Sequence, residues 1–322
     1  MSGSNAPMDV YKEHPHTHYG FIIGFVPNLA LLSYTTVKLI QSLKRSENVE
    51  KYGQNRTVVF SLIFIALLSR CIFEADQIYF HFLRNRQSEK LNTAFFQLDN
   101  LPTLLIITLA SFFSNYWHKH YTRFEGENAK ESSFYPYFLT GMNIILYLSF
   151  LALAVCSFIN PSNRYFAAAI FGAFCLGLVI IAVILGITGK RLYKRATTFV
   201  SYTGRNIKSS KGFQRSYSSL LLCCSIKIIQ QGIALYAQID NQSSFAFEGI
   251  VKAGGVWYYL YEFAFIFVFF TIGETCFFLF LIILLDINAT KCEELLNKKV
   301  AMTSLQGPLL SSDRSHSLID QP

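Results

Sequence analysis

Seven long apolar segments follow one another along the chain, and shorter polar stretches separate them. Each is at least as long as the ~20 apolar residues that an α-helix needs to cross ~30 Å of hydrocarbon. A helix satisfies its backbone hydrogen bonds within itself, so such runs predict spanning helices. The predicted helices cover residues 20–43, 57–83, 91–116, 134–159, 164–188, 216–239 and 255–285. The pattern predicts an all-α, polytopic membrane protein built as a seven-transmembrane helix bundle.

The composition agrees with this prediction, because 52% of the residues are hydrophobic and 15% are charged. A water-soluble domain holds about a quarter charged residues. The apolar content excludes a disordered chain, and seven cysteines in 322 residues are too few for a disulfide-rich secreted scaffold. We expect a lumenal or extracellular arm at 1–19, a membrane domain at 20–288 and a disordered cytosolic tail at 289–322.

The distribution of lysine and arginine predicts the orientation of the chain. Of the basic residues outside the apolar segments or at their very ends, six lie on the side of the N-terminus and nineteen on the opposite side. Loops rich in Lys and Arg stay in the cytosol. We therefore expect the N-terminus outside or in a lumen and the C-terminus in the cytosol. The net charge of +8 follows from this topology and indicates no nucleic-acid partner.

Several ionisable residues lie inside the predicted helices, where they are costly and usually face the bundle interior. Arg70 and Glu74 are four residues apart, so they share one face of a helix. Asp99 lies in the third helix and Glu274 in the seventh, and the sixth holds Lys227 with two glutamines. We predict a buried polar network of Arg70, Glu74, Asp99 and Glu274, in which Arg70 neutralises the glutamates. Two roles for this network remain open, a purely structural one and one in ligand binding or proton transfer.

The segment 189–215 between the fifth and sixth helices carries eight basic residues and no acidic one. This density suggests a cytosolic surface for an acidic partner or anionic lipid, although cytosolic loops are ordinarily positive. The candidate contact residues are Lys190, Arg191, Lys194, Arg195, Arg205, Lys208, Lys211 and Arg215. Farther on, Cys292 follows the last helix closely, which is typical of a palmitoylation site.

Missing residues argue against other classes of seven-helix protein. The last predicted helix contains no lysine that could hold retinal, and one histidine, His81, lies within the helices, which excludes a clustered zinc site. Rhodopsin-type receptors carry an acid-Arg-Tyr motif at the end of helix three and an Asn-Pro-x-x-Tyr motif in helix seven. Neither motif is present at these places in the chain. The sequence therefore predicts no enzymatic activity, no cofactor and no metal site.

A series of short motifs extends from the first predicted helix to the seventh. Their positions are Val37 to Ile40, Lys44, Arg45, Glu50 to Gly53, Arg56 to Phe60, Arg70, Leu98, Asp99, Pro102, Gly189 to Leu192 and Glu274. In this order they resemble the motifs of the tobamovirus-multiplication-protein family of plants and, more distantly, of the orphan-receptor-like lysosomal proteins of animals. The proline that follows the family's late glutamate is missing here.

The resemblance implies a receptor-like scaffold in a vacuolar, lysosomal or endosomal membrane. Members of the family associate with small GTPases of the Arf-like or Rag type, so it implies such a partner on the cytosolic face. Two alternatives remain open from the residues, namely a G-protein-coupled receptor for an unknown ligand and a proton- or solute-coupled transporter. The sequence does not indicate the oligomeric state.

Overall fold

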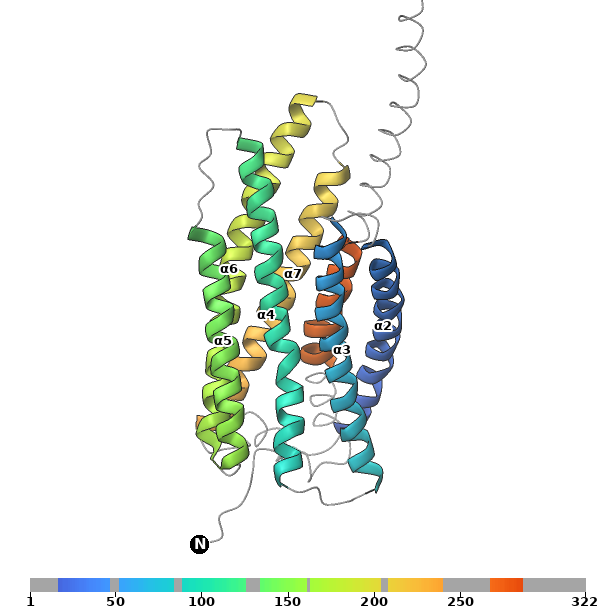
Figure 1. Ribbon diagram of the computed structural model, residues 1–322, viewed down its shortest axis with the longest axis vertical. Helices are drawn as coiled ribbons and strands as arrows, with labels where there is room; N and C mark the ends of the chain where they lie inside the picture. Colours follow the sequence, from blue (N-terminus) through green and yellow to red (C-terminus); the bar gives the residue numbers. More distant parts are fainter. Residues whose placement is uncertain are drawn as a thin grey trace, which may run out of the picture. The chain divides into compact units, whose positions relative to one another are not determined.

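The computed structural model describes residues 17–46, 52–83, 89–125, 134–160, 163–203, 208–239 and 267–285, and all of these except 160 and 163 are helical (Figure 1). The elements are α2 (Thr17–Ser46), α3 (Tyr52–Leu83), α4 (Glu89–Glu125), α5 (Phe134–Ile159), α6 (Arg164–Thr203), α7 (Lys208–Ile239) and the π-helix η1 (Phe267–Thr275). Residues 276–285 continue η1 as an α-helix. The predicted all-α fold is confirmed over these residues.

Six of the described helices are long and apolar enough to cross a membrane, as expected for a polytopic membrane protein. Their apolar stretches are Ile22–Lys44, Arg56–Tyr79, Thr93–Lys119, Tyr135–Ile159, Tyr165–Lys194 and Tyr217–Tyr236. The predicted seventh helix is described from residue 267 onward, and its apolar part, Ile272–Leu285, is shorter than these stretches. A seventh span remains a prediction.

The chain divides into two compact units, Met1–Phe280 and Leu281–Pro322. The first holds the six long helices and η1, and consecutive helices in it run in opposite directions (Figure 1). The described part of the second unit is the helical segment 281–285. The predicted arm, most of the predicted tail and Cys292 lie outside the described residues.

Helix α4 lies at the centre of the packing in the first unit. It contacts α3, α5, α6 and η1, and Leu104, Ile106 and Ile107 in its middle are fully buried. Close approach to its neighbours depends on small residues, as in other membrane bundles. A Cβ atom on Gly177 of α6 would lie 3.0 Å from Leu146 of α5 and 3.2 Å from Ile107. Three helices therefore meet where Gly177 has no side chain.

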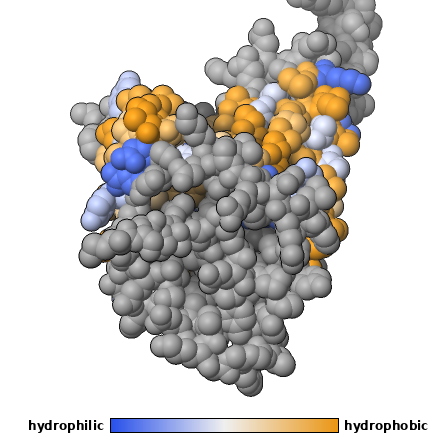
Figure 2. Space-filling model, turned by 90° about the horizontal axis from the view of Figure 1, so that it is seen from below, coloured by the Kyte–Doolittle hydropathy of each residue, from blue (hydrophilic) through white to orange (hydrophobic). Residues whose placement is uncertain are grey.

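The sides of the first unit expose apolar residues. On α5 the exposed fractions are 65% for Ile145, 62% for Leu148 and 63% for Leu151. In the end-on view of Figure 2, the described residues at the rim are mostly hydrophobic. Several hydroxyl groups within the helices donate to a backbone carbonyl one turn earlier, as Thr35 does to the carbonyl of Leu31 at 2.7 Å. An exterior of this kind suits lipid and would be unfavourable in water.

The segment 189–215 differs from the loop that the sequence suggested. Helix α6 continues through Thr203 and α7 begins at Lys208, so most of this segment is helical. The 40 residues of α6 reach about 60 Å at 1.5 Å per residue, twice the thickness of the hydrocarbon. The hydrophobic pattern predicted the apolar part of α6, residues 164–188. It did not predict the polar part that continues the same helix to Thr203.

Candidate functional site

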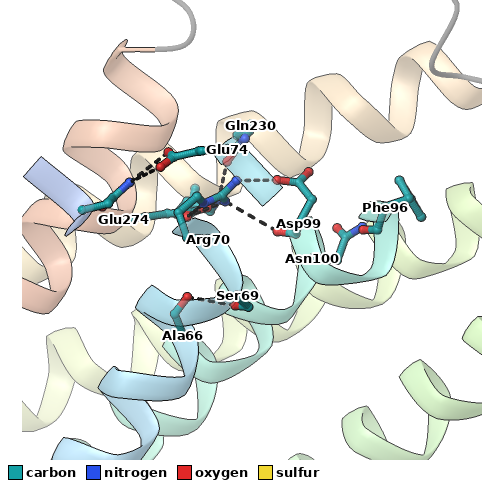
Figure 3. A network of polar contacts seen from close by, with 11 residues as sticks. Ala66, Ser69, Arg70, Glu74, Phe96, Asp99, Asn100, Gln230 and Glu274 are labelled. Carbon is teal, nitrogen blue, oxygen red and sulfur yellow. Dashed lines mark hydrogen bonds and ion pairs between the residues drawn. The ribbon is translucent and has the colours of Figure 1, made fainter. Parts of the chain in front are cut away.

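Arg70 of α3 is the centre of a buried polar network. It is 2% exposed, and its Nε and Nη2 atoms donate hydrogen bonds of 2.7 and 2.5 Å to Oε2 of Glu274 in η1 (Figure 3). Its Nη1 atom donates to Oδ1 of Asp99 in α4 at 2.5 Å. The guanidinium also lies 5.6 Å from the centre of the Phe73 ring. One arginine therefore joins three helical segments through charge-assisted hydrogen bonds.

The second carboxylate oxygen of Glu274 accepts a hydrogen bond from Nζ of Lys227 in α7. Nζ of Lys227 also donates to Oε1 of Gln230, one helical turn farther along. Lys227 and Glu274 are each 1% exposed. Glu274 is therefore held between two cations from different helices, which offsets the large cost of removing its charge from water.

Gly273 allows η1 to approach α7 at this point. A Cβ atom there would lie 3.1 Å from Cγ2 of Ile226 and 3.2 Å from Cδ of Lys227. The Lys227 chain has little freedom to move away, because its Nζ atom is bound to Glu274 and Gln230. Gly273 lies in the π-helical turn of η1, a geometry that is uncommon and is frequent at functional sites.

A second polar group lies beside this network and joins α2, α3 and η1. Nδ2 of Asn28 donates to both carboxylate oxygens of Glu74, at 2.9 and 3.1 Å. Oδ1 of Asn28 accepts a 2.5 Å hydrogen bond from the hydroxyl of Thr275. The bonds from Nδ2 and the bond to Oδ1 all require the same orientation of the amide. Glu74 and Asn28 are each 1% exposed, so the group is fully inside the bundle.

The structure brings three of the four predicted network residues into direct contact, namely Arg70, Asp99 and Glu274. Glu74 is buried as well, but its hydrogen bonds from described residues come from Asn28, where we had expected Arg70. Asp99 lies at the edge of the network, with 23% of its side chain exposed.

The predicted network omitted Asn28, Lys227, Gln230 and Thr275. Lys227 could have been included from the sequence alone, since a lysine in the middle of an apolar segment needs an anionic partner. Asn28 and Thr275 are uncharged and gave no comparable signal. Their role depends on which helices are neighbours, and the apolar pattern does not contain that information.

The basic residues of α6 and α7 lie at one end of the bundle, where the C-terminal part of α6 meets the N-terminal part of α7 (Figure 1). Gly189 marks the crossing, because a Cβ atom there would lie 3.1 Å from the ring of Tyr217 and 3.4 Å from Trp117. Lys190 directly follows this glycine, and Arg215 is two residues before Tyr217. Both basic side chains are exposed.

A group of hydroxyls secures the same end of the bundle. Ser114 of α4 lies 2.7 Å from the hydroxyl of Tyr135 in α5 and 3.1 Å from that of Thr188 in α6. The ring of His118 stacks on Tyr135, with centroids 4.2 Å apart. Thr188 is two residues before Lys190. The basic part of α6 therefore begins next to a point where hydrogen bonds hold α4, α5 and α6 together.

Of the eight predicted contact residues, Lys190, Arg191, Lys194 and Arg215 are exposed. We call these four the basic end. Arg195 lies in α6, and Lys208 and Lys211 lie in α7, but their side chains are not among those described. Arg205 lies outside the described residues. Comparisons of the chain with known protein families, with characterised proteins and with solved structures find no match.

Proposed function

We propose that this protein is a receptor-like membrane scaffold, without enzymatic activity, that recruits an acidic cytosolic partner through the basic end. The observation that carries the proposal is the helical form of this surface. Lys190, Arg191 and Lys194 project from a continuous helix whose length exceeds the membrane thickness. A helix presents its charges in a fixed arrangement, so less side-chain and backbone freedom is lost on binding than for a flexible loop.

The proposal requires the basic end to face the cytosol, with seven helices crossing the membrane and the N-terminus outside. Exposed basic residues of α2, α4, α6 and α7 support this orientation, because they lie at the same end of the alternating helices (Figure 1). Lys44 near the end of α2 and Lys119 near the end of α4 are the other examples.

The class of partner and the compartment rest on the motif resemblance. It points to a small GTPase of the Arf-like or Rag type and to a vacuolar, lysosomal or endosomal membrane. Anionic lipid headgroups near the bilayer would be attracted to the same lysines and arginines. A GTPase differs from lipid in that its binding depends on the bound nucleotide.

Co-purification tests the proposal. The tagged full-length protein in detergent is mixed with Arf-like and Rag-type GTPases, each loaded with GDP or a non-hydrolysable GTP analogue, and a heterotrimeric Gα subunit is included. Retention of an Arf-like or Rag-type GTPase in one nucleotide state supports the proposal. Retention of Gα alone favours a G-protein-coupled receptor, and retention of none contradicts recruitment of a GTPase.

The buried charges favour a second candidate function, a proton- or solute-coupled transporter. Arg70 and Lys227 lie inside apolar stretches of spanning length, and both contact Glu274, which lies in the shorter apolar stretch Ile272–Leu285. Ionisable groups at such positions often mark a transport path. Flux measured in liposomes distinguishes the two functions. A transporter moves protons or a solute at a rate that falls when Glu274 becomes Gln, whereas a scaffold shows no flux above that of empty liposomes.

A further inference from the structure

Glu74 differs from the other two carboxylates of the core in the partners that it has. Glu274 accepts hydrogen bonds from two cations, Arg70 and Lys227, and Asp99 accepts one from Arg70. Within the described part of the chain, the hydrogen bonds to Glu74 come from one neutral amide nitrogen, that of Asn28. The charge of Arg70 is near, but the hydrogen bonds of its guanidinium go to the other two carboxylates. A fully buried carboxyl group with one neutral donor and a cation shared in this way favours its neutral form.

The charges of the surrounding helices lead to the same conclusion. Arg70 on its own helix and Lys227 on α7 are positive, Asp99 on α4 and Glu274 on η1 are negative, and α2 contributes the neutral Asn28. If all three carboxyl groups were ionised, this cluster would hold one negative charge more than its two cations offset. Glu274 has two cationic partners and Asp99 is partly exposed, so Glu74 is the group that most easily remains neutral.

We propose that Glu74 is a proton-binding site in the interior of the bundle, and that Asn28 and Thr275 connect this site to α2 and η1. In the neutral form, the carboxyl keeps its bonds to Asn28 and leaves Arg70 to Asp99 and Glu274. When the carboxyl O–H bond breaks and the proton passes to water, the new anion lies one turn from Arg70 on the same helix face. It then competes with Asp99 for Arg70.

Proton release at Glu74 is therefore coupled to the contact between α3 and α4. The Arg70–Asp99 bonds join these helices, and Asp99 loses its cation when Arg70 turns toward Glu74. The inference stands apart from the recruitment of a partner, since no residue of the basic end takes part in it. Either proposal can fail while the other holds.

Infrared difference spectroscopy tests the inference on the full-length protein in lipid nanodiscs. A protonated carboxyl group gives a carbonyl band that moves on exchange into heavy water. We expect such a band in the wild-type protein, its loss in the Glu74→Gln variant, and its retention in the Asp99→Asn variant. A band that survives in Glu74→Gln, or a wild-type protein with no such band at any pH at which it is folded, overturns the inference.

The Asn28→Ala variant decides the matter if Glu74→Gln does not fold. Removing the amide takes away the hydrogen bonds that Asn28 donates to the carboxyl group, so the carbonyl band of Glu74 shifts in frequency. A shifted band assigns the proton to the carboxyl that Asn28 touches. An unshifted band assigns it to another group and contradicts the proposal.

Discussion

The Nη2 atom of Arg70 lies 2.5 Å from Oε2 of Glu274, although the two residues are 204 positions apart in the chain. This contact joins α3 to η1, and Lys227 brings α7 to the same carboxylate. Breaking a buried pair by removing one partner costs more than the pair contributes, because it leaves an unpaired charge in the interior. The core is therefore sensitive to single neutral substitutions.

Replacing Glu274 with Gln should destabilise the protein by about 3–5 kcal/mol, because Arg70 and Lys227 then remain buried without their shared anion. Asp99→Asn serves as a control and should cost clearly less, since Asp99 is partly exposed. Unfolding monitored in detergent measures both effects. Equal losses of stability in the two variants would show that the contacts of Glu274 with Arg70 and Lys227 stabilise the protein no more than the contact of Asp99 with Arg70.

Gly273→Ala should destabilise the protein by about 1–3 kcal/mol, because the new methyl group meets Ile226 and the bound chain of Lys227. Gly232→Ala in α7 is the matched control, since a Cβ atom there has nothing within 4 Å. Alanine favours a helix over glycine, so the control should be neutral or more stable by up to ~1 kcal/mol. A Gly273→Ala variant as stable as the control would refute the close approach of η1 to α7.

Thr275→Val should cost about 1–3 kcal/mol, because it leaves the buried Oδ1 atom of Asn28 without its donor. Thr36→Val removes a hydroxyl that bonds to the backbone carbonyl of Leu32 in its own helix, and it should change stability by less than ~0.5 kcal/mol. The midpoints of thermal unfolding compare the two variants. Similar shifts would mean that Asn28 does not connect α2 to η1.

The sequence predicted the approximate positions of the six long apolar helices that the structure describes, because membrane crossing imposes a length and an apolar character that single segments display. It also identified Arg70, Asp99 and Glu274, since charges inside apolar runs stand out. The sequence did not predict the hydrogen bonds between Glu74 and Asn28. That contact depends on the packing of α2 against α3, which hydrophobic periodicity does not determine.

The helical form of 189–203 was missed for a related reason. The run of basic and hydroxyl residues after Gly189 ends the apolar pattern, and that pattern was the criterion for a helix. The polar part of α6 continues a helix that has already formed, and adding residues to an existing helix is easier than starting one. Lys and Arg are also good helix formers.

The orientation can be tested with two cysteines on one helix. Lys190→Cys and Tyr165→Cys place exposed thiols near the two ends of the apolar stretch of α6, in a protein whose Cys292 is replaced by serine. In sealed vesicles with the cytosolic face outward, a membrane-impermeant maleimide should label position 190, and it should label position 165 only after permeabilisation. The reverse pattern would place the basic end outside the cytosol.

Recruitment measured for matched charge variants tests the central claim most directly. Lys190→Glu with Arg191→Glu reverses two of the four charges of the basic end, and Lys44→Glu with Lys119→Glu reverses two exposed lysines on other helices at the same end of the bundle. The amount of nucleotide-loaded GTPase retained per folded membrane protein is then compared with that of the wild type. We expect at least a ~10-fold loss for the first variant, which corresponds to about 1.4 kcal/mol, and a small change for the second. Recruitment at the wild-type level by the Lys190 and Arg191 variant would contradict the account.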